Sequence, residues 1–244
     1  KTKMTTFKGT LKYVVLKNLN DIYFLSVNLI AIIILVIISF NAKSLNYDSA
    51  YQYFNLYGFF IALSIGKGVI SEELSNRHAE LIFTKPIKKE IYFLFIYIGC
   101  LIMSIITIAG FMLISAITSI YFSSFSLVSF LKVLSYICLN QITIFALLFF
   151  ISSWAPGSSN SVLLFSLVIS YPIIRLLLFS NDPHLENILN ILKDIITPFK
   201  IDPFINREFS VLKLIYHWFV YPISLLYGTI KIIEKNFYYT YQNS

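Results

Sequence analysis

The charged side chains of this sequence that could do chemistry gather in one short segment. Residues 70–90 read ISEELSNRHAELIFTKPIKKE, in which Glu72 and Glu73 are adjacent, Arg77 follows about one helical turn later and Glu80 adds a further acid. Neighbouring carboxylates suit two tasks, namely general acid/base catalysis and ion pairing with the basic groups of a partner. Only 13% of the residues are charged, so this segment is the first candidate for a functional surface.

Phosphate and metal chemistry lack their usual motifs in this chain. The sequence contains no G-x-x-x-x-G-K-[ST] loop, so we do not expect it to hydrolyse ATP by that route, and any nucleotide energy must come from a partner. It contains no H-E-x-x-H, and His78, His184 and His217 are too scattered to predict a metal site. We therefore expect no catalytic residue, no metal and no cofactor in this chain.

Glu72, Glu73 and Arg77 also form the pattern E-E-x-x-x-R. This pattern resembles the first motif of intramembrane CAAX-type proteases, and the resemblance implies an enzyme that uses these residues for catalysis. That family also carries an F-x-x-x-H motif and a second histidine motif in later spans. Neither motif is present here, since the fourth residue before His217 is Lys213. We keep the protease as the alternative function.

The same segment resembles the loop between the second and third membrane helices of ABC-2 type transporter permeases. The matching features are Glu72-Glu73, Glu80-Leu81, and Pro86-Ile87 followed by basic residues, whereas His78-Ala79 stands where the family usually has Gly-Thr. In that family the loop is a coupling helix that docks on an ATPase. The resemblance implies a docking surface made of Glu72, Glu73, Leu74, Arg77, Glu80, Leu81, Pro86, Lys88 and Lys89. A solvated turn is the alternative interpretation.

Long apolar runs must position this segment. Hydrophobic residues make up 57% of the chain and its mean hydropathy is +0.76, which predicts an integral membrane protein. A spanning helix needs about 20 apolar residues. The runs predict an all-α fold with six transmembrane helices: Ile22–Phe40, Tyr51–Val69, Ile91–Ile114, Leu131–Trp154, Val162–Ser180 and Leu212–Ile233. The third run stays apolar as far as Phe122, so its end is left open.

An amphipathic helix is expected before the first span, in residues 1–21. Its mostly apolar face carries Phe7, Leu11, Val14, Val15 and Asn18. Lys8 and Lys12 lie beside that face and Lys17 lies across from it, which suits a helix in the headgroup region. The family resemblance makes it an elbow helix on the cytoplasmic surface, and a basic tail that only sets orientation is the alternative. With the N-terminus inside, most Lys and Arg of the short loops are cytoplasmic, so both termini are predicted to be cytoplasmic. The net charge of +7 then belongs to the inner face and favours lipid rather than nucleic acid as partner.

A second amphipathic helix is expected in the outer loop, residues 181–210. Apolar residues from Leu185 to Phe199 recur at helical spacing, and Asp182 and Pro183 suit the cap and first position of a helix. Such a helix either caps the bundle at the outer interface or takes part in substrate release.

Few polar side chains lie inside the predicted spans. The candidates for a substrate path are Asn28, Asn140, Gln141, Ser166, Ser170, Tyr171 and Arg175. Amides at this depth also bond neighbouring helices, and we favour this bridging role for the three amides. Arg175 lies near the outer end of its span and is expected to reach the interface. In ABC-2 permeases the fifth span, here carrying Pro172, helps to line the path between two subunits.

The resemblance implies one ABC-2 type transmembrane domain over residues 1–244, in the cell membrane. The chain would be one of two permease subunits, identical or homologous, and two copies of a partner ATPase would bind ATP and Mg. The transported substrate would be an amphipathic peptide, a lipid or a drug-like molecule. Export fits better than import, because nothing in the sequence provides for capture of a soluble ligand outside.

Overall fold

A computed structural model describes residues 2–42, 47–75, 89–121, 126–155, 159–166 and 215–242. Its named elements are α1 (Thr2–Leu19), α2 (Ile22–Ala42), α3 (Tyr47–Ile65), α4 (Val69–Ser75), α6 (Lys89–Tyr121), α7 (Leu127–Ser152), the π-helix η1 (Tyr216–Val220) and α12 (Tyr221–Gln242). A further helical stretch covers 159–166. These ranges contain helices and no strands, as the all-α prediction requires.

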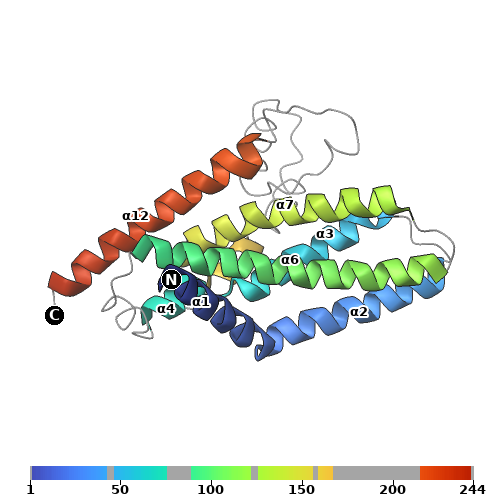
Figure 1. The fold of residues 1–244 in the computed structure, drawn as a ribbon, viewed down its shortest axis with the longest axis horizontal. Helices are drawn as coiled ribbons and strands as arrows, with labels where there is room; N and C mark the ends of the chain where they lie inside the picture. Colours follow the sequence, from blue (N-terminus) through green and yellow to red (C-terminus); the bar gives the residue numbers. More distant parts are fainter. Residues whose placement is uncertain are drawn as a thin grey trace, which may run out of the picture.

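Helices α2, α3, α6 and α7 run side by side along the long axis of the molecule, and α12 crosses at an angle (Figure 1). Helix α7 is the centre of the bundle, because it packs against α3, α4, α6, α12 and η1. Its second half is buried on every side, as Ile144, Phe145 and Leu148 show with exposed fractions of 1%, 0% and 0%. A helix that is apolar all round is typical of such a position.

The described residues contain three helical segments long and apolar enough to cross a membrane: Tyr53–Glu72, Glu90–Ile117 and Leu127–Ser152. The first of these takes in most of α3, the turn that follows it and the start of α4. The bent pair Phe7–Leu19 and Ile22–Ile37 adds a fourth if it counts as one span. The three segments match the second, third and fourth predicted spans, so the membrane class is confirmed in this coarser form. The first predicted span, Ile22–Phe40, overlaps only the second half of the bent pair, so it stays a prediction. Much of the fifth predicted span, and the start of the sixth, lie outside the described residues, and the number six stays a prediction.

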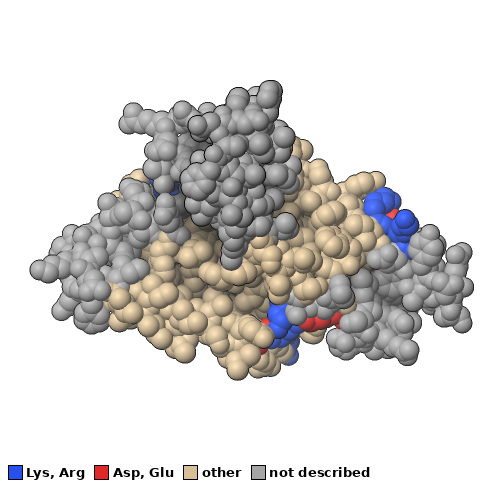
Figure 2. Space-filling model, turned by 180° about the vertical axis from the view of Figure 1, so that it is seen from behind, with Lys and Arg blue, Asp and Glu red and all other residues tan. Residues whose placement is uncertain are grey.

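The outer surface of the bundle fits a lipid environment. Large apolar side chains are exposed on α2 and α6, including Leu29, Ile33, Ile106 and Ile117 with exposed fractions of 61%, 50%, 63% and 69%. Figure 2 shows mostly uncharged residues on the described surface seen from behind, with the charged side chains in a few small groups. Apolar patches of this extent are unusual on soluble proteins.

Three helices have ends that differ from the predicted spans. α7 begins at Leu127 rather than at the predicted Leu131, because the Ser126 side chain accepts from the backbone N–H of Ser129. α6 extends to Tyr121, past the predicted end at Ile114 and close to the limit that its apolar run allows. α12, which covers much of the predicted sixth span, continues to Gln242 rather than ending at Ile233.

The predicted helix before the first span is present as α1. Its axis lies at 65° to that of α2. The chain turns at Asp21, whose Oδ1 accepts the backbone N–H of Tyr23 at 2.8 Å and so caps the first turn of α2. The buried side of α1 includes Val14 and Asn18, both on the predicted apolar face. α1 packs mainly against α6 and more lightly against α2.

The π-helix η1 has a cause in the sequence. The N–H of Tyr221 donates to the carbonyl of Tyr216, five residues earlier, and Pro222 has no N–H to donate. The carbonyl of His217 therefore takes a partner from another helix, the hydroxyl of Thr143 on α7, at 2.8 Å. This bond ties η1, and with it α12, to the central helix of the bundle.

Candidate functional site

The acidic segment begins at a tight turn, residues 66–68, between α3 and α4. The N–H of Gly66 donates to the carbonyl of Ala62 at 2.8 Å and so completes the last turn of α3. Gly68 has φ +61°, a left-handed conformation that favours glycine. A Cβ at this position would lie 2.3 Å from Glu72 Oε1, so the carboxylate passes directly over the glycine. The left-handed conformation is the stronger reason for glycine here, because the carboxylate ends a flexible side chain that can shift away from a Cβ.

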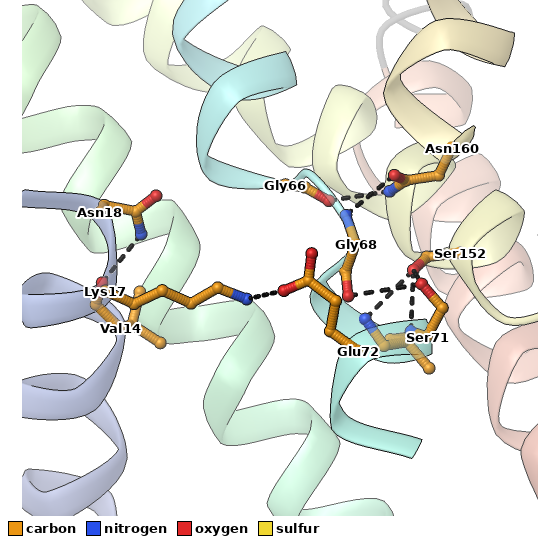
Figure 3. Close-up of polar contacts among 10 residues, drawn as sticks. Val14, Lys17, Asn18, Gly66, Gly68, Ser71, Glu72, Ser152 and Asn160 are labelled. Atoms are coloured by element: carbon orange, nitrogen blue, oxygen red, sulfur yellow. Dashed lines mark hydrogen bonds and ion pairs between the residues drawn. The ribbon is translucent and has the colours of Figure 1, made fainter. Parts of the chain in front are cut away.

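Asn160 fastens this turn to the helical stretch 159–166 (Figure 3). Its Oδ1 accepts the N–H of Gly68 at 2.9 Å, and its Nδ2 donates to the carbonyl of Gly66 at 2.8 Å and to that of Leu148 at 3.4 Å. The side chain is fully buried, with an exposed fraction of 0%. One amide therefore holds both ends of the turn and reaches the backbone of α7 as well.

Ser152, the last residue of α7, caps the start of α4. The first N–H groups of a helix have no partner within the helix. Here Ser152 Oγ accepts from the N–H of Ile70 at 3.1 Å and from the N–H of Ser71 at 3.2 Å. The cap comes from a distant helix because Gly68, just before α4, has no side chain to supply it. Since α4 has only seven residues, its start depends on this contact.

Charged contacts hold the other side of the turn. Lys17 on α1 donates to Glu72 Oε2 at 2.7 Å, and the exposed fractions of these two side chains are 29% and 33%. The ammonium of Lys67, within the turn, lies 4.0 Å from the ring centroid of Tyr23 on α2. The prediction that Lys17 lies across from the packed face of α1 is wrong. Lys17 is one helical turn from the buried Val14 and points toward α4, because the helix packs on that side.

The two sets of contacts differ in strength. An ion pair near the surface contributes about 0 to 1 kcal/mol and is screened by salt. Removing the partner of a buried donor or acceptor costs about 1 to 3 kcal/mol for each group left without a bond. The buried contacts of Asn160 and Ser152 are therefore the stronger attachment of α4, and the contact of Glu72 with Lys17 is the weaker one.

The structure describes only part of the predicted docking surface. Glu72 lies in α4 and binds Lys17, and the backbones of Glu73 and Leu74 complete the same helix. Lys89 is the first residue of α6. Five members lie outside the described residues: Arg77, Glu80, Leu81, Pro86 and Lys88. The docking role therefore stays a prediction.

Sequence reasoning missed Gly68, Ser152 and Asn160. The available signals were the glycines on either side of Lys67 at the end of an apolar run, and the polar residues that follow the fourth run. Neither signal says which distant groups meet.

The polar amides predicted within the spans bond between helices. Asn28 Oδ1 accepts the hydroxyl of Tyr57 on α3 at 2.7 Å, and Asn140 Nδ2 donates to Asn55 Oδ1 on α3 at 3.3 Å. Gln141 is fully buried, and its Oε1 accepts the hydroxyl of a serine on α6, Ser104, at 3.0 Å. The bridging interpretation of these amides is confirmed, and a role in a substrate path stays a prediction.

The remaining path candidates are described in only one case. Ser166 ends the helical stretch 159–166 with an exposed side chain. Ser170, Tyr171, Arg175 and the whole predicted outer helix, within 181–210, lie outside the described residues.

Gly58 allows α3 to approach α7 closely beside Gln141. A Cβ at Gly58 would lie 2.9 Å from Gln141 Nε2 and 2.9 Å from a methyl group of Ile137. Small residues at helix crossings are typical of membrane bundles, because close backbone approach maximises packing there.

Among the described residues, no group of three or more His, Cys, Asp or Glu side chains could hold a metal ion. Glu72, an acid that the protease alternative requires, is ion-paired with Lys17. Neither a protein-family model, nor a curated protein, nor a solved structure matches this chain. A functional assignment therefore depends on the residues and their geometry.

Proposed function

We propose that this chain is the membrane-spanning permease subunit of an ATP-driven exporter. The observation that supports the proposal best is the attachment of α4, a short acidic helix at the end of a membrane span, to four other parts of the bundle. It contacts α7 through Ser152, the stretch 159–166 through Asn160 at its preceding turn, and α1 through Glu72; the turn itself contacts α2 through Lys67. A helix bound in this way can pass a displacement to the spans.

The arrangement of the ends supports the same function. Helix α4, the start of α6 and the C-terminal end of α12 lie toward one end of the molecule, and the N-terminus lies toward it as well (Figure 1). In the proposed permease this end is cytoplasmic and faces the ATPase subunits. α1 at 65° to α2 then lies at the inner membrane surface as the elbow helix.

The proposed cycle requires a second permease subunit and two ATPase subunits. Closure of the ATPases on ATP and Mg displaces the segment 70–90, and the attached spans open a path between the permease subunits toward the outside. An amphipathic peptide, a lipid or a drug-like molecule leaves the membrane by this path. The chain itself supplies no phosphate-binding loop.

Charge reversal in the acidic segment tests the docking step. The double variant Glu73→Lys, Glu80→Lys should lose most of its complex with the ATPase, because like charges placed together at an interface cost several kcal/mol. The measurement is the yield of ATPase that co-purifies with the membrane-embedded chain. The matched control is Glu186→Lys with Glu208→Lys, the same change of charge in the predicted outer loop, which should leave the yield unchanged. Equal yields from both double variants would show that the acidic segment is only a solvated loop.

A further inference from the structure

The turn at 66–68 is held on two sides by contacts of different kinds. On one side, the fully buried Asn160 bonds the backbone of Gly66 and Gly68. On the other side, the partly exposed Lys17 and Glu72 form an ion pair, and Lys67 lies over the ring of Tyr23. The first set is neutral and shielded from water, and the second is charged and open to it.

We propose that Asn160 is a positioning residue that makes α4 and the stretch 159–166 move as one body, while the Lys17–Glu72 contact opens and closes. The role of this joint motion rests on the proposed permease function, in which it carries a displacement of α4 into the predicted fifth span. The stretch 159–166 includes the start of that span.

The geometry of the Asn160 amide explains why its hydrogen bonds to the turn 66–68 stay formed. Asn160 both accepts and donates at the two ends of one turn, so the turn cannot open without breaking both bonds together. The first residues of α4 follow directly and are held to α7 by Ser152. No water reaches the side chain to replace them. The ammonium and carboxylate of Lys17 and Glu72, in contrast, exchange their bond for water and counterions when they separate.

Ser161 provides a matched control on the same helical stretch. Its hydroxyl donates to the carbonyl of Leu63 on α3 at 2.8 Å. The variant Ser161→Ala therefore removes a hydrogen bond between the same stretch and α3 without touching the turn. Lys12→Gln serves as the control for Lys17→Gln, because Lys12 is an exposed lysine on the same helix.

Two spin-label distances in the full chain, in lipid nanodiscs without ATPase, test the inference. One pair joins positions 16 and 75 across α1 and α4, and the other joins positions 162 and 75 across the stretch 159–166 and α4. Leu16 and Val162 are exposed, and the two native cysteines, Cys100 and Cys138, are replaced first. Each distance distribution is measured at about 0.05 M and about 1 M NaCl, since salt screens exposed ion pairs at these concentrations.

The 16–75 distribution should broaden in high salt and in Lys17→Gln, whereas the 162–75 distribution should stay unchanged. Asn160→Ala and Asn160→Leu, which both lose the acceptor for Gly68 and the donor to Gly66, should broaden the 162–75 distribution. Ser161→Ala and Lys12→Gln should leave both distributions as in the wild type.

Two results would overturn the inference. One is equal broadening of the two distributions in wild-type protein at high salt. The other is an unchanged 162–75 distribution in Asn160→Leu, which is close to asparagine in size and makes neither bond. If Asn160→Ala fails to fold, the salt series and Asn160→Leu still decide. Because no ATPase is present, either result rejects the joint motion alone and leaves the exporter function to the co-purification test.

Discussion

Gly68 shows how a single residue fixes the geometry of the turn before α4. Its φ of +61° favours glycine, and the Glu72 carboxylate occupies the space where a side chain would begin. Gly68→Ala should lower the free energy of unfolding by about 1 to 3 kcal/mol, from the cost of a left-handed residue and from displacement of the carboxylate.

The matched control for Gly68→Ala is Gly9→Ala on α1, where a Cβ would meet nothing within 4 Å. That change should raise the free energy of unfolding by about 0.5 to 1 kcal/mol, because alanine favours a helix interior over glycine. Thermal unfolding in detergent micelles measures both variants. Equal melting temperatures for the two would contradict the assigned role of the turn.

At the scale of residues, sequence reasoning found the charges and missed their partners. Glu72 stands out because acids are rare in this chain. Asn160 does not, since its importance depends on backbone groups of Gly66 and Gly68 that lie more than 90 positions earlier in the chain. Periodicity and composition report local structure and carry no information on such distant pairs. The amides at 28, 140 and 141 were easier to interpret, because a polar group within an apolar run needs a partner.

The π-helix η1 gives a prediction at the scale of elements. Thr143→Val keeps the shape of the side chain and removes the hydroxyl that binds the carbonyl of His217. The variant should lose about 1 to 2 kcal/mol of stability, within the range for unsatisfied buried groups and for polar contacts in membranes. Thr143→Ser, which retains the hydroxyl, should lose less.

Thr107→Val is the control for this prediction. The hydroxyl of Thr107 donates to the carbonyl of Met103 on its own helix, so its loss separates no pair of helices. Unfolding in a denaturing detergent compares the three variants. A loss for Thr107→Val as large as that for Thr143→Val would show that the bond to η1 has no special role.

The helices themselves were largely predictable, and their ends were not. Runs of apolar residues long enough to cross a bilayer mark the cores of α3, α6 and α7. Ser126 and Asp21 set the starts of α7 and α2 through hydrogen bonds from the backbone to their side chains. A hydropathy pattern does not reveal such bonds. The π-helix was missed for a related reason. Pro222 has no N–H to donate, but the partner of the carbonyl that it leaves lies on another helix.

At the scale of the whole molecule, α7 links the acidic helix α4 to the rest of the helix bundle. α7 occupies the centre of the bundle, contacts the helix of the predicted sixth span through η1 and supports α4 at its own last residue, Ser152. A displacement of α4 therefore acts on the central helix rather than on a peripheral loop. The proposed exporter function would require this connection of its membrane subunit, and a solvated turn would not need it.

The most direct test is to purify the chain alone and together with a candidate ATPase subunit, and to measure ATP turnover in lipid nanodiscs. The account predicts a stable complex with vanadate-sensitive turnover, and no turnover by the isolated chain. Vanadate-sensitive turnover by the isolated chain would contradict it. So would failure to bind any candidate ATPase together with cleavage of a membrane-bound peptide that is lost in Glu72→Gln, the result that the protease alternative predicts.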